Sequence, residues 1–173
     1  MDATKKRKAL RLFSYGMYIM TSRGKHGYAA GTVTWLSQAS FKPPLVMAAI
    51  RRDSKLFVCL GESRVAAIHI LSSDQKSIAQ KFFSPTKVSD GRINGEPFVA
   101  GKTSAPVLKN FSAYIECQVK EIVDSGGDHA VIIMEIVDAE LRENVRPAGT
   151  RRLALELRRL DRSKKKMGAI WLP

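Results

Sequence analysis

The chain has 173 residues, of which 45% are hydrophobic, and it carries a formal net charge of +13. This composition excludes an intrinsically disordered chain, and the lack of an apolar run of about 18 residues excludes a membrane-spanning helix. The excess of Lys and Arg is concentrated in residues 1–8 and 142–166. Nucleic-acid-binding domains more often carry their charge on the folded body, so basic ends argue against a nucleic-acid partner.

The length predicts a single domain over residues 1–173. Cys59 and Cys117 form no spaced framework and both lie in apolar surroundings, so we expect reduced, buried thiols. The N-terminal residues are charged and lack the apolar stretch of a secretory signal. These features predict a cytoplasmic protein.

The first third of the chain predicts one helix followed by strands. Residues 2–15 carry apolar residues at helical spacing, which indicates a short helix. Residues 17–21 predict a strand that turns back through a glycine-rich hairpin. Two more strands are expected at residues 28–36 and 45–51.

Two further short helices are predicted, at residues 54–61 and 72–83. The second begins where Ser72 and Gln75 have the spacing of a capping box. Residues 84–110 are rich in proline and glycine and predict a long loop. Apolar and β-branched runs place the remaining strands at residues 65–71, 114–123 and 129–141.

The strand run at residues 130–134 is apolar at every position. A strand of a small barrel that is covered on both faces suggests a second subunit, so we predict a homodimer. Strands predominate and a βαβ alternation is missing, which predicts a mainly β fold built as an antiparallel barrel with short helices.

The sequence offers few groups for catalysis by side chains alone. His26, His69 and His129 lie far apart and lack metal-ligand spacing, so we predict no metal site. Neither a nucleophile elbow nor a P-loop occurs. Catalysis is therefore expected to depend on a bound organic cofactor.

Residues 51–55 end a strand and open a helix, with Ser54 as the expected N-cap. Unpaired helix amides beside Arg51 and Lys55 would suit a phosphate group. A capped helix surrounded by solvated charges explains the same residues, and this alternative stays open.

Residues 30–46, AGTVTWLSQASFKPPLV, resemble the flavin-contacting strand and loop of the flavin reductase-like, FMN-binding split-barrel family. Four more segments resemble family motifs in the same order. They are RDS at 52–54, ILSSDQ with AQKF at 70–82, SAPVL at 104–108, and YIEC with GDH at 114–129. The resemblance covers residues 9–141, whereas the basic segment 142–173 diverges. It implies a six-stranded antiparallel Greek-key split β-barrel that is homodimeric, with flavin at the subunit interface.

The resemblance also implies a cofactor site. By this resemblance the isoalloxazine ring would be bordered by Thr32, Val33, Thr34 and Trp35 and flanked by Ala49, Ile50 and Arg51. The ribityl chain or phosphate would be reached by Ser37 and Gln38, and the phosphate would be held by Ser54 and Lys55. The flavin tail would lie near Phe82 and Phe83.

His129 is the one catalytic candidate, because its ring could approach the flavin or the nicotinamide. An ordinary turn histidine is the alternative. Trp35 as a plain core tryptophan and the two phenylalanines as helix packing also stay open.

The implied activity is that of an NAD(P)H-dependent flavin reductase. Hydride would pass from NAD(P)H, the cosubstrate, to N5 of FMN, with FAD or riboflavin as alternative flavins, and a partner monooxygenase would use the reduced flavin. Other split-barrel flavoproteins remain as alternatives: a pyridoxamine-phosphate-oxidase-like enzyme, a metal or cobalamin reductase, and a non-catalytic electron carrier.

Overall fold

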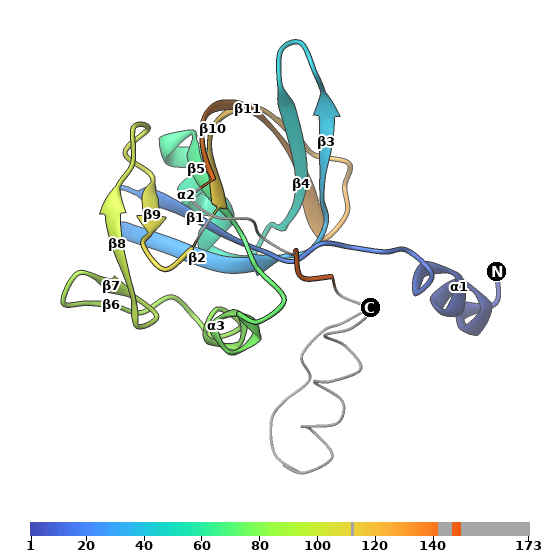
Figure 1. Cartoon of the computed structure of the whole chain (residues 1–173). Helices are drawn as coiled ribbons and strands as arrows, with labels where there is room; N and C mark the ends of the chain where they lie inside the picture. Colours follow the sequence, from blue (N-terminus) through green and yellow to red (C-terminus); the bar gives the residue numbers. More distant parts are fainter. Residues whose placement is uncertain (112, 142–146, 150–173) are drawn as a thin grey trace.

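A computed structural model describes residues 1–111, 113–141 and 147–149, and its centre is one curved antiparallel sheet (Figure 1). The strands run in the order β2-β1-β5-β10-β11-β4-β3. They are β1 (Tyr18–Gly24), β2 (Gly27–Val33), β3 (Leu36–Ser40), β4 (Leu45–Arg51), β5 (Val65–Ile70), β10 (Ala113–Val123) and β11 (His129–Leu141). The mainly β fold with short helices is confirmed.

The described residues give this sheet seven strands where six were expected. The predicted strand 28–36 is in fact two strands, because the chain leaves β2 after Val33 and starts β3 at Leu36. β3 then pairs with β4. The β4 bounds agree with the prediction, and the turn between β3 and β4 holds Pro43 and Pro44 as sequence alone requires.

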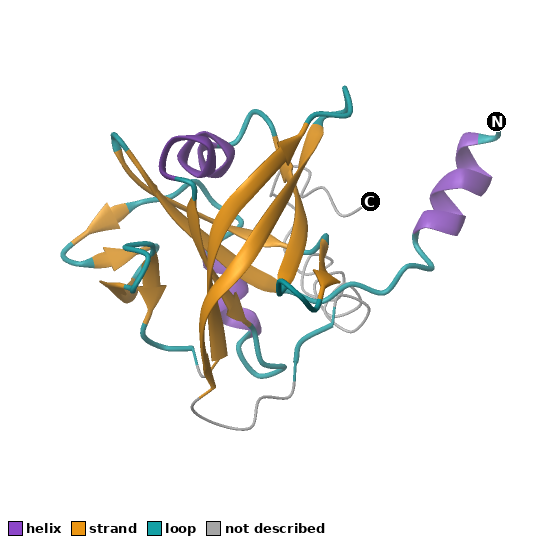
Figure 2. Cartoon of the chain, turned by 90° about the horizontal axis from the view of Figure 1, so that it is seen from above, coloured by secondary structure: helices purple, strands orange, loops and turns teal. Residues whose placement is uncertain are grey.

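The inner face of the sheet forms the main core together with α2 (Lys55–Ser63). Alternate residues of β11, Ala130, Ile132 and Met134, are fully buried there. Leu60 of α2 is also fully buried, so the helix covers this core (Figure 2). Helix α2 runs two residues past the predicted end, because Arg64 rather than Gly61 takes the left-handed conformation that ends it.

The predicted loop 84–110 is wrong in part, since it contains a second, four-stranded antiparallel sheet. Its turns place Asp90-Gly91 and Asn94-Gly95 at positive φ, the combination that two-residue hairpins need. The strands are β6 (Val88–Ser89), β7 (Arg92–Ile93), β8 (Glu96–Ala100) and β9 (Pro106–Leu108).

Helix α3 (Lys76–Lys81) is shorter than predicted at both ends. Only half of the capping box forms: Gln75 Oε1 accepts from Ser72 N at 3.2 Å. The Ser72 hydroxyl binds the Asp74 carboxylate instead of a helix amide, which explains the later start.

Helix α1 (Ala3–Leu10) begins at the predicted N-terminal segment but ends five residues early. Asp2 caps it by accepting from Thr4 N and Lys5 N. No residue of α1 is buried, and the helix stands away from the sheet in both views (Figures 1 and 2). Without packing there is nothing to extend it into residues 11–15.

Two buried polar side chains tie the sheets together. His69 of β5 donates from Nδ1 to Ile19 O of β1 (3.0 Å) and accepts at Nε2 from Leu108 N of β9 (2.8 Å). Glu116 of β10 accepts from Lys102 N at 3.0 Å and from Thr103 N at 2.8 Å, which holds the β8–β9 turn over the main sheet. Each side chain is almost fully buried.

The C-terminal part of the chain is described only at residues 147–149. Ala148 is buried and exchanges backbone hydrogen bonds with Met17 and Leu71, so this short stretch joins the core. The predicted divergent segment 142–173 otherwise lies outside the described residues. Within the described part, no helix has the length and apolar character to cross a membrane.

Candidate functional site

The predicted ring-contacting residues meet where β2, β3 and β4 come together. Leu36 N donates to Thr34 O (3.1 Å) and Ala49 N donates to Trp35 O (2.9 Å), which fixes the Thr34–Trp35 connection against β4. Thr32 is held by α3, because its amide donates to Phe82 O (3.4 Å) and its hydroxyl to Ala79 O (3.3 Å).

Strand alternation separates the predicted residues into inward and outward side chains. Val33 and Ile50 are buried in the main core, so only their backbone is available to a ligand. Ala49 and Arg51 face outward, and their Cα partners on β11 are Val131 and His129. Ser37 and Gln38 are exposed on the edge strand β3, where each side chain bonds a nearby backbone carbonyl.

The start of α2 has the expected N-cap. Ser54 Oγ accepts from Phe57 N (3.1 Å) and donates to Arg51 O (2.7 Å), so this hydroxyl belongs to the cap. Lys55 is exposed at the first helical position. With the Phe57 amide engaged by this cap, the amides of Lys55 and Leu56 and the Lys55 ammonium are the candidate anion-binding groups of this helix end.

Arg51 is already paired with a carboxylate. Its guanidinium binds both oxygens of Asp53, with Nε to Oδ1 at 2.9 Å. This hydrogen bond raises the pKa of Arg51 and lowers that of Asp53. Arg51 is thus a positioned cation whose charge is balanced, and Asp53 is a site neighbour that the sequence reasoning missed although it lies within RDS.

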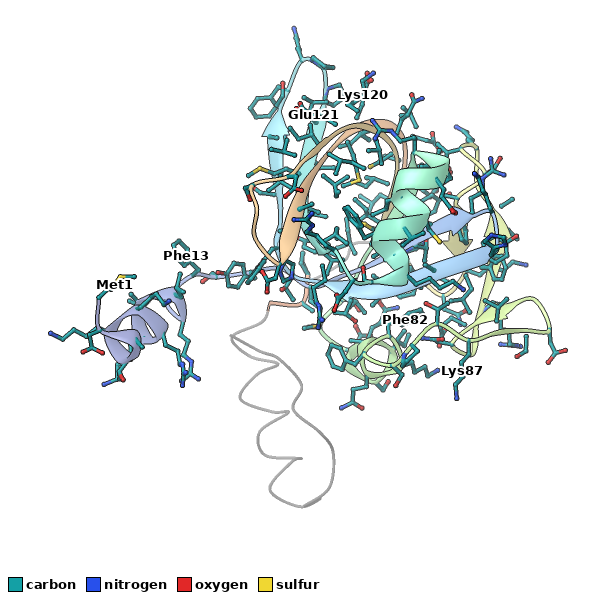
Figure 3. The ribbon with its side chains drawn as sticks, turned by 180° about the vertical axis from the view of Figure 1, so that it is seen from behind. Met1, Phe13, Phe82, Lys87, Lys120 and Glu121 are labelled. Atoms are coloured by element: carbon teal, nitrogen blue, oxygen red, sulfur yellow. The ribbon has the colours of Figure 1, made fainter. Side chains whose placement is uncertain are left out.

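The two phenylalanines of α3 differ. Phe82 is 3% exposed and packs in the second core cluster with Leu71 and Ala79, on the α3 side of the sheet (Figure 3). Its ring is therefore core, as the alternative reading held, and only its carbonyl reaches β2. Phe83 is half-buried, which leaves part of its ring at the surface.

An aromatic row lies at the outward side of this region. The rings of Trp35 and His129 are 4.8 Å apart, and Tyr15 follows at 6.4 Å from Trp35. His129 Nδ1 and Asp128 Oδ1 are 2.9 Å apart, and this hydrogen bond lowers the pKa of Asp128. No sequence pattern pointed to Tyr15, whereas Asp128 is part of the GDH motif.

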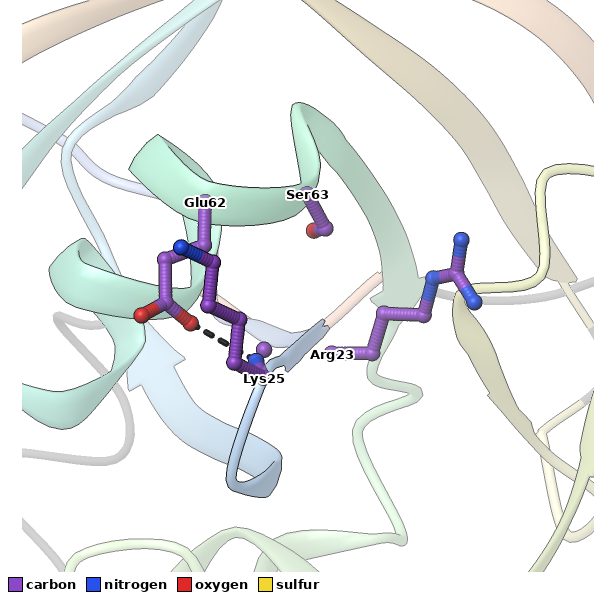
Figure 4. A pocket seen from close by; sticks show the side chains of 5 residues that line it. Arg23, Lys25, Glu62 and Ser63 are labelled. Atoms are coloured by element: carbon purple, nitrogen blue, oxygen red, sulfur yellow. Dashed lines mark hydrogen bonds between the residues drawn. The ribbon is translucent and has the colours of Figure 1, made fainter.

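Two surface hollows lie away from these residues. One is lined by Arg23, Gly24, Lys25, Glu62 and Ser63, at the C-terminal end of α2, where Lys25 N donates to Glu62 (2.8 Å; Figure 4). The other lies between β8, β9 and β10 and includes Lys102 and Glu116. Neither hollow includes a predicted site residue.

Comparison with known proteins decides the family. Residues 10–159 match the flavin reductase like domain. The chain belongs to this family. It is similar to FMN reductase (NADH) RutF 2 of Rhizobium rhizogenes, 28% identical over 138 residues, 80% of this chain and 78% of that protein. It is also similar to the 4-hydroxyphenylacetate 3-monooxygenase reductase component of Pseudomonas aeruginosa, 25% identical, with 79% and 81% covered.

The solved structure of the flavin reductase PheA2 in its native state superposes on this fold with a TM-score of 0.72. The two chains are 28% identical, and the match covers 86% of this chain and 93% of that one. The resemblance drawn from the motifs is therefore confirmed, and the match extends past Leu141 to residue 159.

Proposed function

We propose that this protein is an NAD(P)H-dependent flavin reductase that binds FMN at the junction of β2, β3 and β4. The observation that carries the proposal is the convergence of the family motif, fixed by the Trp35–Ala49 backbone bond, with the capped N-terminus of α2. The motif segment offers backbone peptide groups that can contact a flat ring system. The N-terminus of α2 offers amides that can bind a phosphate.

The residues fit a flavin on structural grounds. Ala49 presents only a methyl group on the outward face of β4. The indole Nε1–H of Trp35 is a buried donor without a partner among the described residues. We assign Thr34, Trp35 and Ala49 to the ring and Lys55 with the α2 amides to the phosphate. Bound flavin supplies the acceptor, at N5, for a hydride from reduced nicotinamide.

The side chains at the site would hold the flavin and shield it from water. None of them needs to act as a strong acid or base. Proximity and orientation of the two ring systems supply most of the rate, because the encounter becomes intramolecular. His129, oriented by Asp128 through Nδ1, is the group that could stand beside the nicotinamide. We keep it as the catalytic candidate.

We also propose that the protein is a homodimer whose curved sheets close as Greek-key split barrels, with the outer face of β4 and β11 in the contact. Val131 and Ile133 are half-buried on this face, and Met47 beside them is 42% exposed. A second subunit would cover these side chains. Met47→Asp should therefore give monomer in sedimentation, whereas Val88→Asp, an exposed residue on β6, should not.

Reduced flavin would serve a partner oxygenase; the proposal is supported by the Pseudomonas aeruginosa relative, whose name makes it the reductase component of a monooxygenase. We place the enzyme in the cytoplasm, because both Cys59 and Cys117 are free thiols.

Anaerobic mixing with FMN and NADH or NADPH tests the function. Loss of the oxidised flavin absorbance at a rate proportional to enzyme supports it, and no acceleration over the protein-free reaction refutes it. Lys55→Ala should weaken FMN about tenfold and leave phosphate-free lumiflavin unchanged. Equal loss for both flavins would place the phosphate elsewhere.

A further inference from the structure

The side chain of Trp35 carries an unusual hydrogen-bonding feature. Its Nε1 is buried and has no hydrogen-bond partner, the one side-chain nitrogen or oxygen of this kind among the described residues. A buried donor without an acceptor costs free energy in the free protein, because water no longer bonds to it. The backbone of Trp35 is fixed by its bond to Ala49, so the indole is held in place.

The surroundings of the indole are aromatic rather than aliphatic. His129 lies 4.8 Å away and Tyr15 6.4 Å away, ring centre to ring centre. Asp128 hydrogen-bonds Nδ1 of His129 and so fixes the orientation of the imidazole ring. This ring lies next to the indole of Trp35. Flat rings beside a fixed donor suit a flat conjugated ligand that carries a hydrogen-bond acceptor.

We propose that the Trp35 indole N–H binds an acceptor atom of the isoalloxazine ring and so positions the flavin for reduction. This inference rests on the flavin site proposed above and adds a side-chain contact to the backbone contacts of the motif. The acceptors of the ring system are its two carbonyls and its unprotonated ring nitrogens. The Trp35 N–H would therefore bind the redox-active part of the flavin rather than its phosphate.

Nε1 of Trp35 is closed to solvent in the free protein, so a neighbouring side chain must shift for the contact to form, and within this proposal we assign that movement to Tyr15. Tyr15 follows four exposed residues, 11–14, and the fully exposed helix α1. Tyr15 belongs to none of the buried core clusters, and Met17 is the first residue after it that is buried.

Trp35→Phe is the decisive variant, because phenylalanine keeps an aromatic ring and removes only the donor edge. We expect the dissociation constants of FMN and lumiflavin to rise equally, about fivefold to tenfold. The flavin-free variant should melt no lower than wild type, because the unpaired N–H is gone. A purely structural Trp35 predicts the reverse, a lower melting temperature with both dissociation constants unchanged in the folded variant, and that result would overturn the proposal.

A measurement that keeps Trp35 intact guards against a Trp35 variant that fails to fold. Trp171→Phe leaves Trp35 as the single indole, so its N–H signal in an NMR spectrum is assigned at once. Lumiflavin should shift this signal downfield, and an unmoved signal at saturation refutes the contact. Tyr15→Ala should raise the flavin association rate, and an unchanged rate refutes the role of Tyr15 as cover.

These outcomes separate the two levels of the argument. If wild type binds neither FMN nor lumiflavin, the proposed function fails and the Trp35 contact with it. If wild type binds both flavins and Trp35→Phe binds each of them as tightly as wild type does, the flavin site stands and only the Trp35 contact is overturned.

Discussion

Replacing His69 with glutamine should remove part of the acid sensitivity of this fold. His69 is fully buried, with Nδ1 donating to Ile19 O and Nε2 accepting from Leu108 N. A second ring proton would face the Leu108 N–H and break that bond. The neutral imidazole is therefore the form that the folded protein accepts.

Burial lowers the pKa of His69 from 6.5 to about 4. Between these values the unfolded chain binds a proton that the native protein does not, so stability falls as the pH is lowered through this window. One pKa unit corresponds to about 1.4 kcal/mol, so His69 alone should cost wild type roughly 2–3 kcal/mol of unfolding free energy between about pH 7 and about pH 4.5.

Urea unfolding at the two pH values measures this difference. His69→Gln can still donate and accept, but it does not titrate, so its loss between the two pH values should be smaller than that of wild type by roughly 2–3 kcal/mol. His26→Gln, at an exposed turn, is the matched control and should behave as wild type. Equal pH dependence of wild type and His69→Gln would refute the reasoning.

Three other outcomes are expected. Glu116→Gln should lower the unfolding free energy by about 1–3 kcal/mol in denaturant melts, because the Lys102 and Thr103 amides lose a buried carboxylate; an unchanged midpoint contradicts this. Deleting residues 2–10 should leave the melting temperature and FMN affinity unchanged, since α1 buries nothing. Asp128→Asn should lower kcat of flavin reduction if His129 acts there, because the ring loses the carboxylate that orients it, and an unchanged kcat removes His129 from the reaction.

Sequence periodicity was sufficient where one face of a long strand is buried. β4 alternates over seven residues and is bounded by prolines before it and a capped helix after it, so both ends were predictable. The strands β6 and β7 have two residues each, which is too short for any alternation to register. Asp90-Gly91 and Asn94-Gly95 were the available signal, because such pairs favour two-residue hairpins.

The candidate site could be placed from the sequence to the extent that it is built from backbone. The motif places Thr34 and Trp35 beside β4, and the Ser54 cap follows from residue type and position. Side-chain direction was not predictable for Phe82, because α3 packs on a core formed by distant residues such as Leu71. The Tyr15–Trp35 contact joins residues twenty positions apart and depends on the tertiary path of the N-terminal segment.

The geometry of β4 and β11 links the proposed flavin site to the proposed dimer. The alternation that buries Ile50 turns Ala49 and Arg51 outward, where they oppose Val131 and His129. The residues proposed to flank the ring and the half-exposed apolar residues thus share one face. A subunit that covers Met47 and Ile133 also approaches this edge, so loss of the dimer should weaken flavin binding. Changes near α1 or the second sheet lack this link, because they lie on other elements of the fold.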